Sequence, residues 1–174
     1  MSMFCFQCQE AAMGKGCTIQ GVCGKQPDTA KLQDLLVHTT KSLAFFSRKL
    51  RAGGDVNSEV DYYLINSLFT TITNANFDND MIIERIREGL KLRDNLWKMA
   101  KEKNMVIEDT FPTYLKETSE LVTNDDMIAF AETVGVLRTE NEDIRSLREL
   151  VIYGLKGLTA YAEHAYNLGK QNPE

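Results

Sequence analysis

Apolar residues after Pro27 recur at steps of three and four positions, the spacing that places side chains on one face of an α-helix. Polar caps and glycines divide this pattern into six predicted helices. They lie at residues 28–51, at 59–73, from 80 onward, from about 112 onward, at 125–133 and at 142–168. No stretch alternates apolar and polar residues for long enough to form a strand, so the pattern predicts an all-α fold.

Short polar and glycine signals set the predicted helix ends. N-caps are predicted at Asp28 or Thr29, at Ser58, within Asp78-Asn79-Asp80 and at Asn141, because each precedes an apolar stretch and such side chains accept hydrogen bonds from unpaired backbone N–H groups. Gly53 and Gly54 are expected to end the first helix.

Two stretches repeat the same apolar pattern. The residues from Leu32 (LQDLLVHTTKSLAFF) align without a gap on those from Leu147 (LRELVIYGLKGLTAY). In both, stripe positions follow at steps of 4, 3, 4, 3 and 4, and Lys41 matches Lys156. With three predicted helices on either side of about residue 106, the simplest architecture is two three-helix bundles, at residues 27–106 and 107–174.

Residues 1–26 have no helical or strand period and are predicted to form an irregular loop. Glycines at 14, 16, 21 and 24 indicate several tight turns. Such a loop buries little apolar area, so another agent must order it. All four cysteines of the chain lie in this segment: Cys5, Cys8, Cys17 and Cys23.

The cysteine spacing is C-x2-C-x8-C-x5-C. A close pair followed by two cysteines on a longer excursion can direct four thiolates at one centre, as an iron–sulfur cubane or a zinc ion requires. No signal peptide precedes the cysteines, which favours a metal site over a disulfide framework. Spacing alone leaves a [4Fe–4S] cluster, a structural zinc and two disulfides as alternatives.

Composition excludes other classes of function. The net charge of −5 gives no electrostatic reason to bind nucleic acid. No uncharged apolar run approaches the roughly 20 residues that cross a bilayer, so no membrane contact is expected. The expected location is the cytoplasm.

The opening MFCFQCQEAAMGKGCTIQGVCGKQPD resembles the start of hybrid cluster proteins, the prismane or hydroxylamine reductase family. The stretch TITNANFD at residues 71–78 and the stretch LRELVIYGLKGLTAYAEHA near the end are also similar to family motifs. The resemblance implies that Cys5, Cys8, Cys17 and Cys23 bind a [4Fe–4S] cluster. Lys15 and Lys25 are nearby cations that would stabilise its sulfurs.

The family's active centre is a hybrid iron–sulfur–oxygen cluster held by further cysteines in later domains, and this sequence has no cysteine after Cys23. The resemblance therefore implies the N-terminal electron-transfer domain of a longer protein, with no catalytic residue of its own. Hydroxylamine reduction, and the nitric oxide reduction also proposed for the family, belong to the full-length parent. The implied partners are the remaining domains and an unidentified electron donor. The alternatives are a zinc-stabilised helical interaction module and a free-standing small electron carrier.

Other residues are interpreted more simply. His38 and His164 are expected to pack or to face solvent, not to bind metal, and Trp97 is expected in the core. Thr73 and Asn74 end a helix; the alternative is that their stretch faces the cluster.

Overall fold

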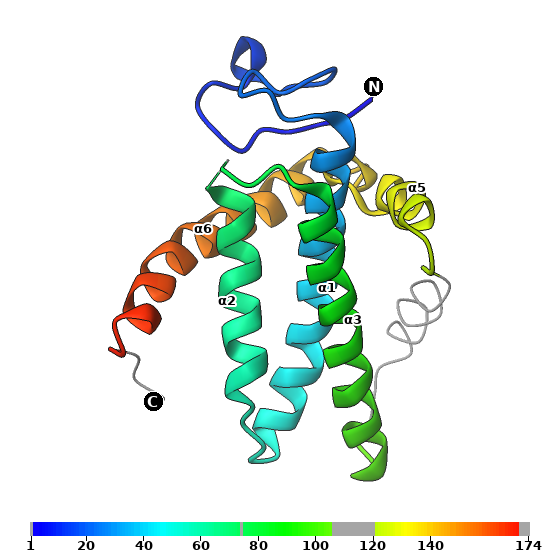
Figure 1. The fold of residues 1–174 in the computed structure, drawn as a ribbon, viewed down its shortest axis with the longest axis vertical. Coiled ribbons are helices and arrows are strands. Elements are labelled where there is room, and N and C mark those ends of the chain that lie inside the picture. The colour runs from blue at the N-terminus through cyan, green and yellow to red at the C-terminus, as the bar shows by residue number, and fades with distance from the viewer. Residues whose placement is uncertain (1, 74, 106–120, 171–174) are drawn as a thin grey trace.

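The computed structural model describes residues 2–73, 75–105 and 121–170 (Figure 1). The helices of these residues are α1 (Pro27–Ala52), α2 (Ser58–Ile72), α3 (Asn79–Glu102), α5 (Asn124–Val134) and α6 (Glu142–Asn167), with 3₁₀ turns η1 (Ala12–Gly14) and η2 (Val136–Arg138). The all-α prediction is confirmed. The helix expected near Pro112 lies outside the described residues, and no described helix is long and apolar enough to cross a membrane.

The helix ends follow the predicted capping signals at α3 and α6 and differ at α1 and α2. The N-cap of α1 is Gln26 and the helix begins at Pro27, so the predicted cap at Asp28 or Thr29 was wrong. Asp78 accepts hydrogen bonds from two backbone N–H groups of α3, and the side chain of Asn141 caps α6 in the same way. At α2 the cap is Asn57, whose side chain accepts from the N–H of Val60, so the predicted cap at Ser58 was wrong by one residue. Gly54 follows α1 with a φ of +93°, a conformation that glycine adopts without steric cost.

Helix α1 lies at the centre and contacts α2, α3 and α5 (Figure 1). Two clusters of buried side chains join α1 to its neighbouring helices in the described part of the chain. At one end α1 packs on α3 and α5, through residues that include Leu36, Ile86 and Met127. At the other end α1 packs on α2 and α3, through residues that include Phe46 and Leu96. Burial of these side chains is the main favourable contribution to the fold.

Helix α6 packs on α2 through polar and aromatic contacts. Glu163 is buried, and its Oε1 accepts hydrogen bonds from the Tyr62 hydroxyl at 3.2 Å and from the Asn66 amide at 2.9 Å. The rings of Tyr62 and Tyr166 stack with centroids 4.1 Å apart. Helix α6 contacts α2, and α5 contacts α1. The division into two bundles near residue 106 stays a prediction.

The apolar stripe of α6 faces away from the described protein. The matching stripe of α1 is fully buried, yet Leu158 is 62% exposed and Tyr161 79% exposed. The exposed apolar side chains of α6 are Ile144, Leu147, Leu150, Val151, Tyr153, Leu155, Leu158 and Tyr161. Contiguous exposed apolar faces of this kind are typical of interaction surfaces.

Candidate metal centre

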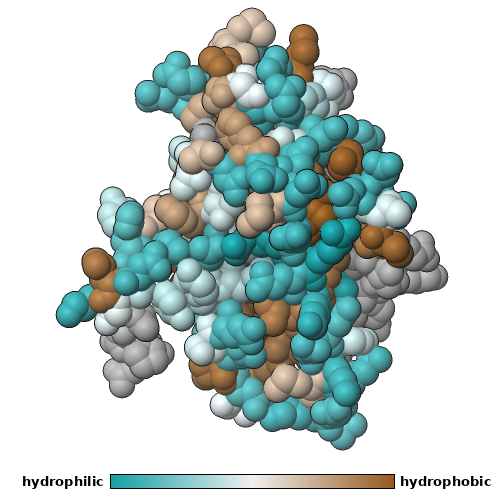
Figure 2. Space-filling model, in the orientation of Figure 1, coloured by the Kyte–Doolittle hydropathy of each residue, from teal (hydrophilic) through white to brown (hydrophobic). Residues whose placement is uncertain are grey.

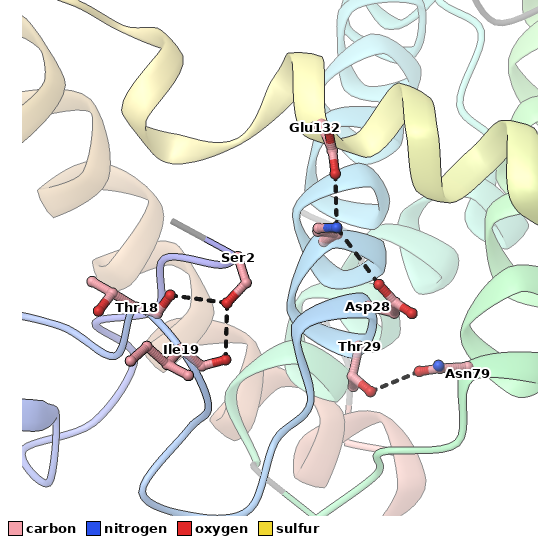
Figure 3. Close-up of polar contacts among 8 residues, drawn as sticks. Ser2, Thr18, Ile19, Asp28, Thr29, Asn79 and Glu132 are labelled. Atoms are coloured by element: carbon pink, nitrogen blue, oxygen red, sulfur yellow. Dashed lines mark hydrogen bonds and ion pairs between the residues drawn. The ribbon is translucent and has the colours of Figure 1, made fainter.

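The backbone pairs two of the cysteines. The N–H of Cys5 donates to the carbonyl of Cys17 at 3.0 Å, and the N–H of Cys17 donates to the carbonyl of Cys5 at 2.8 Å. The Ser2 hydroxyl extends this pairing by donating to the carbonyls of Thr18 and Ile19, both at 3.1 Å (Figure 3). Two segments twelve positions apart are therefore held side by side, with Cys5 and Cys17 directly opposite each other.

Glycines occupy tight positions in the rest of the loop. The N–H of Gly21 donates to the carbonyl of Lys25 at 2.8 Å, which closes a tight turn around Cys23. Gly24 in this turn has a φ of +90°, and a Cβ atom on Gly21 would lie 3.1 Å from the sulfur of Cys23. A Cβ atom on Gly16 would lie 2.7 Å from the Phe4 ring. The loop therefore needs glycine at these turns, as its sequence predicts.

All four cysteines are free thiols, and no disulfide joins them. Cys17 is buried, Cys5 and Cys8 are half-buried, and Cys23 is exposed. Among the described residues, no group of three or more His, Cys, Asp or Glu side chains is arranged to hold a metal ion. The assignment of the four cysteines as ligands therefore stays a prediction.

A buried lysine tests whether an anionic cluster fits this loop. Lys25 is only 1% exposed, and its Nζ lies 3.7 Å from the sulfur of Cys5. No carboxylate of the described residues lies within ion-pair distance of it. A buried ammonium group without an anionic partner is costly. Thiolate ligands of a metal cluster would supply the missing negative charge, so the residues present fit such a group.

Gln7, between Cys5 and Cys8, fastens the loop to the helices. Its amide nitrogen donates to the backbone carbonyl of Thr71 at the end of α2. Its amide oxygen accepts a hydrogen bond of 3.0 Å from Nζ of Lys156 on α6. The loop is thereby attached to two helices far apart in sequence.

The stretch at residues 71–78 contacts the cysteine loop at two points. Thr71 binds Gln7, and the ring of Phe77 lies 5.7 Å from Nζ of Lys25. Thr73 is exposed, and Asn74 lies outside the described residues. These contacts favour the interpretation in which this stretch faces the cysteine loop.

A cavity of about 100 Å³ lies behind the loop, with Cys5, Gln7, Asp34 and Lys156 among its lining residues. Burial raises the pKa of Asp34 to about 7, although the positive charge of Lys156 opposes this shift. Burial also lowers the pKa of Lys156 to about 8. The sequence marks Lys156 only as the counterpart of Lys41, and that match does not reveal its contact with the loop.

The two histidines and the tryptophan pack against aromatic rings. The His38 ring meets Phe130 at 6.1 Å, and the His164 ring meets Phe69 at 6.3 Å. Trp97 packs edge-on against Phe46 in the core at 5.5 Å, as predicted.

Comparison with known proteins gives one consistent result. Residues 3–174 match the family described as the Prismane/CO dehydrogenase family. The chain is 50% identical over 174 residues to a hydroxylamine reductase of Bacteroides fragilis (strain YCH46), covering all of this chain and 30% of that protein. It is 52% identical over 175 residues to a hydroxylamine reductase of Desulfitobacterium hafniense (strain Y51), covering 99% of this chain and 31% of that protein. The chain therefore spans about a third of the length of these relatives.

Proposed function

This chain belongs to the prismane/CO dehydrogenase family, and we propose that it is the [4Fe–4S] electron-transfer domain of a hybrid cluster protein. The observation that carries the proposal is Lys25, a buried cation whose ammonium group donates a hydrogen bond to the sulfur of Cys5. The four free thiols in one irregular loop supply the donor set. The similarity to hydroxylamine reductases over the whole chain supports the same assignment.

Cys5, Cys8, Cys17 and Cys23 would hold the cluster, which when bound accepts and releases one electron at a time. The protein's own residues determine its surroundings. The Cys5–Cys17 backbone pairing fixes two ligands relative to each other, and the burial of Cys17 keeps water from that side. Exposed Cys23 marks the side nearest to solvent.

For the full-length parent we propose the reaction in the relatives' name, reduction of hydroxylamine, with nitric oxide as a second candidate substrate. Hydroxylamine takes up two electrons and two protons, and cleavage of its N–O bond gives ammonia and water. A cluster with four thiolate ligands offers no open position for substrate, and this chain has no other cysteines for a second cluster. We therefore assign the chemistry, and the hybrid cluster, to the rest of the parent.

The proposed partners are the remaining domains of the parent and an electron donor that the structure does not identify. The exposed apolar stripe of α6 supports the first partner. The relatives are about three times as long as this chain, so they contain further protein that is able to cover such a face. We also propose a cytoplasmic location, where thiols stay reduced and are able to bind metal.

The metal content of anaerobically purified chain tests the proposal. We expect four irons and four acid-labile sulfides per chain, and brown protein whose visible absorbance dithionite bleaches. The Cys17→Ala variant should lose iron, sulfide and colour together. Colourless protein with one zinc per chain would instead establish the helical interaction module.

Ammonia formation from hydroxylamine with reduced viologen separates the domain from its parent. The chain alone should take up an electron and give no ammonia, while the full-length protein should turn over. Turnover by the chain near the rate of the parent would place the active centre in these residues and refute the electron-transfer assignment.

A further inference from the structure

Lys25 occupies a fixed position inside the cysteine loop. The Gly21–Lys25 backbone hydrogen bond orients its main chain, and a Cβ atom on Gly21 would lie 3.0 Å from the Lys25 Cβ. Phe77 lies beside the ammonium group at 5.7 Å, where a cation–π contact is favourable. The side chain is therefore held from several sides with its charge directed at Cys5.

The other charged groups near Lys25 form no ion pair with it among the described residues. Its charge acts on both Asp34 and Lys156, and it lowers the pKa of each. Lys156 is itself a cation, and Asp34 is desolvated by burial. The sulfur of Cys5, 3.7 Å away, is the only hydrogen-bond partner of the ammonium group among the described residues.

We propose that Lys25 is the counter-ion of the cluster at Cys5 and that its charge raises the reduction potential of the cluster. This inference rests on the proposed [4Fe–4S] site. Reduction of such a cluster with four thiolates adds one negative charge, from −2 to −3. A fixed cation in a site of low dielectric stabilises the more negative state more strongly, so it shifts the equilibrium toward the reduced form. Lys25 therefore acts on the cluster through its charge and does not bind it as a ligand.

The test compares Lys25→Met and Lys25→Arg with the wild-type chain. Lys15 was also expected beside the sulfurs, but it is exposed, and among the described residues only Lys25 has an ammonium group in contact with a cysteine. Lys15→Met is therefore the matched control. Each protein is prepared anaerobically with its cluster, its iron is counted, and its potential is measured by redox titration followed by absorbance and low-temperature paramagnetic resonance. Lys25→Met should favour the oxidised form by about tenfold or more, which is about 59 mV toward more negative potential for one electron. Lys25→Arg and Lys15→Met should stay near wild type.

Each possible result supports or overturns the inference about Lys25. Equal potentials for wild type and Lys25→Met would overturn it, as would equal shifts in the methionine and arginine variants. If Lys25→Met alone fails to keep iron, the charge is needed to hold the cluster, which supports the counter-ion role. If both Lys25 variants lose iron while Lys15→Met keeps it, the shape of lysine is what the site needs, and the charge argument is wrong. Wild-type chain without iron would instead refute the proposed cluster domain itself.

Discussion

Lys156 of α6 donates a hydrogen bond of 3.0 Å to the side-chain oxygen of Gln7, 149 positions earlier in the chain. The other end of the same amide group donates to the carbonyl of Thr71. Gln7 lies between the two cysteines of the C-x2-C pair, so this bridge fixes that pair relative to α2 and α6. The cysteine loop is thus held by polar contacts with the helices.

Substitution of Lys156 by methionine should loosen the loop. The side chain is buried, so its loss leaves the Gln7 oxygen without a partner at a cost of about 1–3 kcal/mol. We expect faster amide hydrogen exchange around residues 3–9, with little change in α1 and α3. Lys91→Met, on an exposed position of α3, is the control. Unchanged exchange in the loop would show that the bridge does not hold it.

Removal of the proposed cluster should disorder residues 1–26 while the helices persist. The loop contributes only Met3 and Cys17 to a small buried cluster with Ala30, which is little apolar area. Chelation or air oxidation should therefore increase proteolysis within the loop and leave cleavage after Pro27 unchanged. Equal protection with and without metal would mean that packing, and not the cluster, orders this segment.

Helix positions were predictable because local signals determine them. The period of three and four, the caps at Asp78 and Asn141, and the glycines after α1 are all properties of neighbouring residues. The burial of a helix face is not a local property. Leu43 and Leu158 occupy equivalent positions of the repeated pattern, yet Leu43 is fully buried and Leu158 is 62% exposed. The sequence shows that α6 has an apolar stripe but not whether that stripe is buried in the fold.

The cysteine loop was likewise predictable only where local sequence signals mark it. Clustered cysteines and glycines identify the loop from the sequence, and the family resemblance suggests its cluster. The contacts of Gln7, Asp34 and Lys156 come from segments far apart in the chain, and nothing periodic marks them. Buried charged groups are rare and depend on tertiary partners, so only the fold reveals them.

The equivalent leucines give a matched pair for stability. Leu43→Ala should lower the free energy of unfolding by about 2–5 kcal/mol, because it leaves a cavity in the α1–α2–α3 core. Leu158→Ala in the isolated chain should change it by less than about 0.5 kcal/mol. Chemical denaturation measures both.

The same position also tests what covers α6. In the full-length parent, Leu158→Glu should weaken docking of this domain and increase hydrogen exchange along α6. Concentration-dependent dimerisation of the isolated chain that Leu158→Glu abolishes, with no effect of the variant in the parent, would show that a second copy covers the stripe.

Gly89 and Gly154 give a second matched pair. A Cβ atom on Gly89 would lie 2.8 Å from the Thr39 methyl group and would overlap the Tyr63 hydroxyl, which donates to the Arg85 carbonyl at 2.6 Å. Gly89→Ala should therefore destabilise the chain by about 1–3 kcal/mol through overpacking. Nothing lies within 4 Å of a Cβ atom on Gly154. Gly154→Ala should stabilise α6 by up to about 1 kcal/mol, since alanine favours the helix. Equal effects in thermal denaturation would contradict the close packing at Gly89.

His38 should make the fold sensitive to mild acid. Burial lowers its pKa from 6.5 to about 4 in the folded chain, and the charges of Lys41 and Arg93 add to the shift. Between pH 6.5 and 4 the unfolded chain therefore binds a proton that the folded chain does not. The free energy of unfolding attributable to His38 should fall as the pH drops through this window and level off below pH 4, with a loss of up to about 2 kcal/mol at pH 5.

A neutral variant isolates this contribution from the carboxylates that titrate in the same range. His38→Gln should retain more of its neutral-pH stability at pH 5 than wild type does. His164→Gln is the control, because His164 is exposed on α6. The comparison is made by urea denaturation at pH 7 and pH 5, taking the difference between the two conditions for each protein. If wild type and His38→Gln lose the same stability, His38 accepts its proton in the folded chain, and the environment formed by Phe130 and α1 does not exclude the charge.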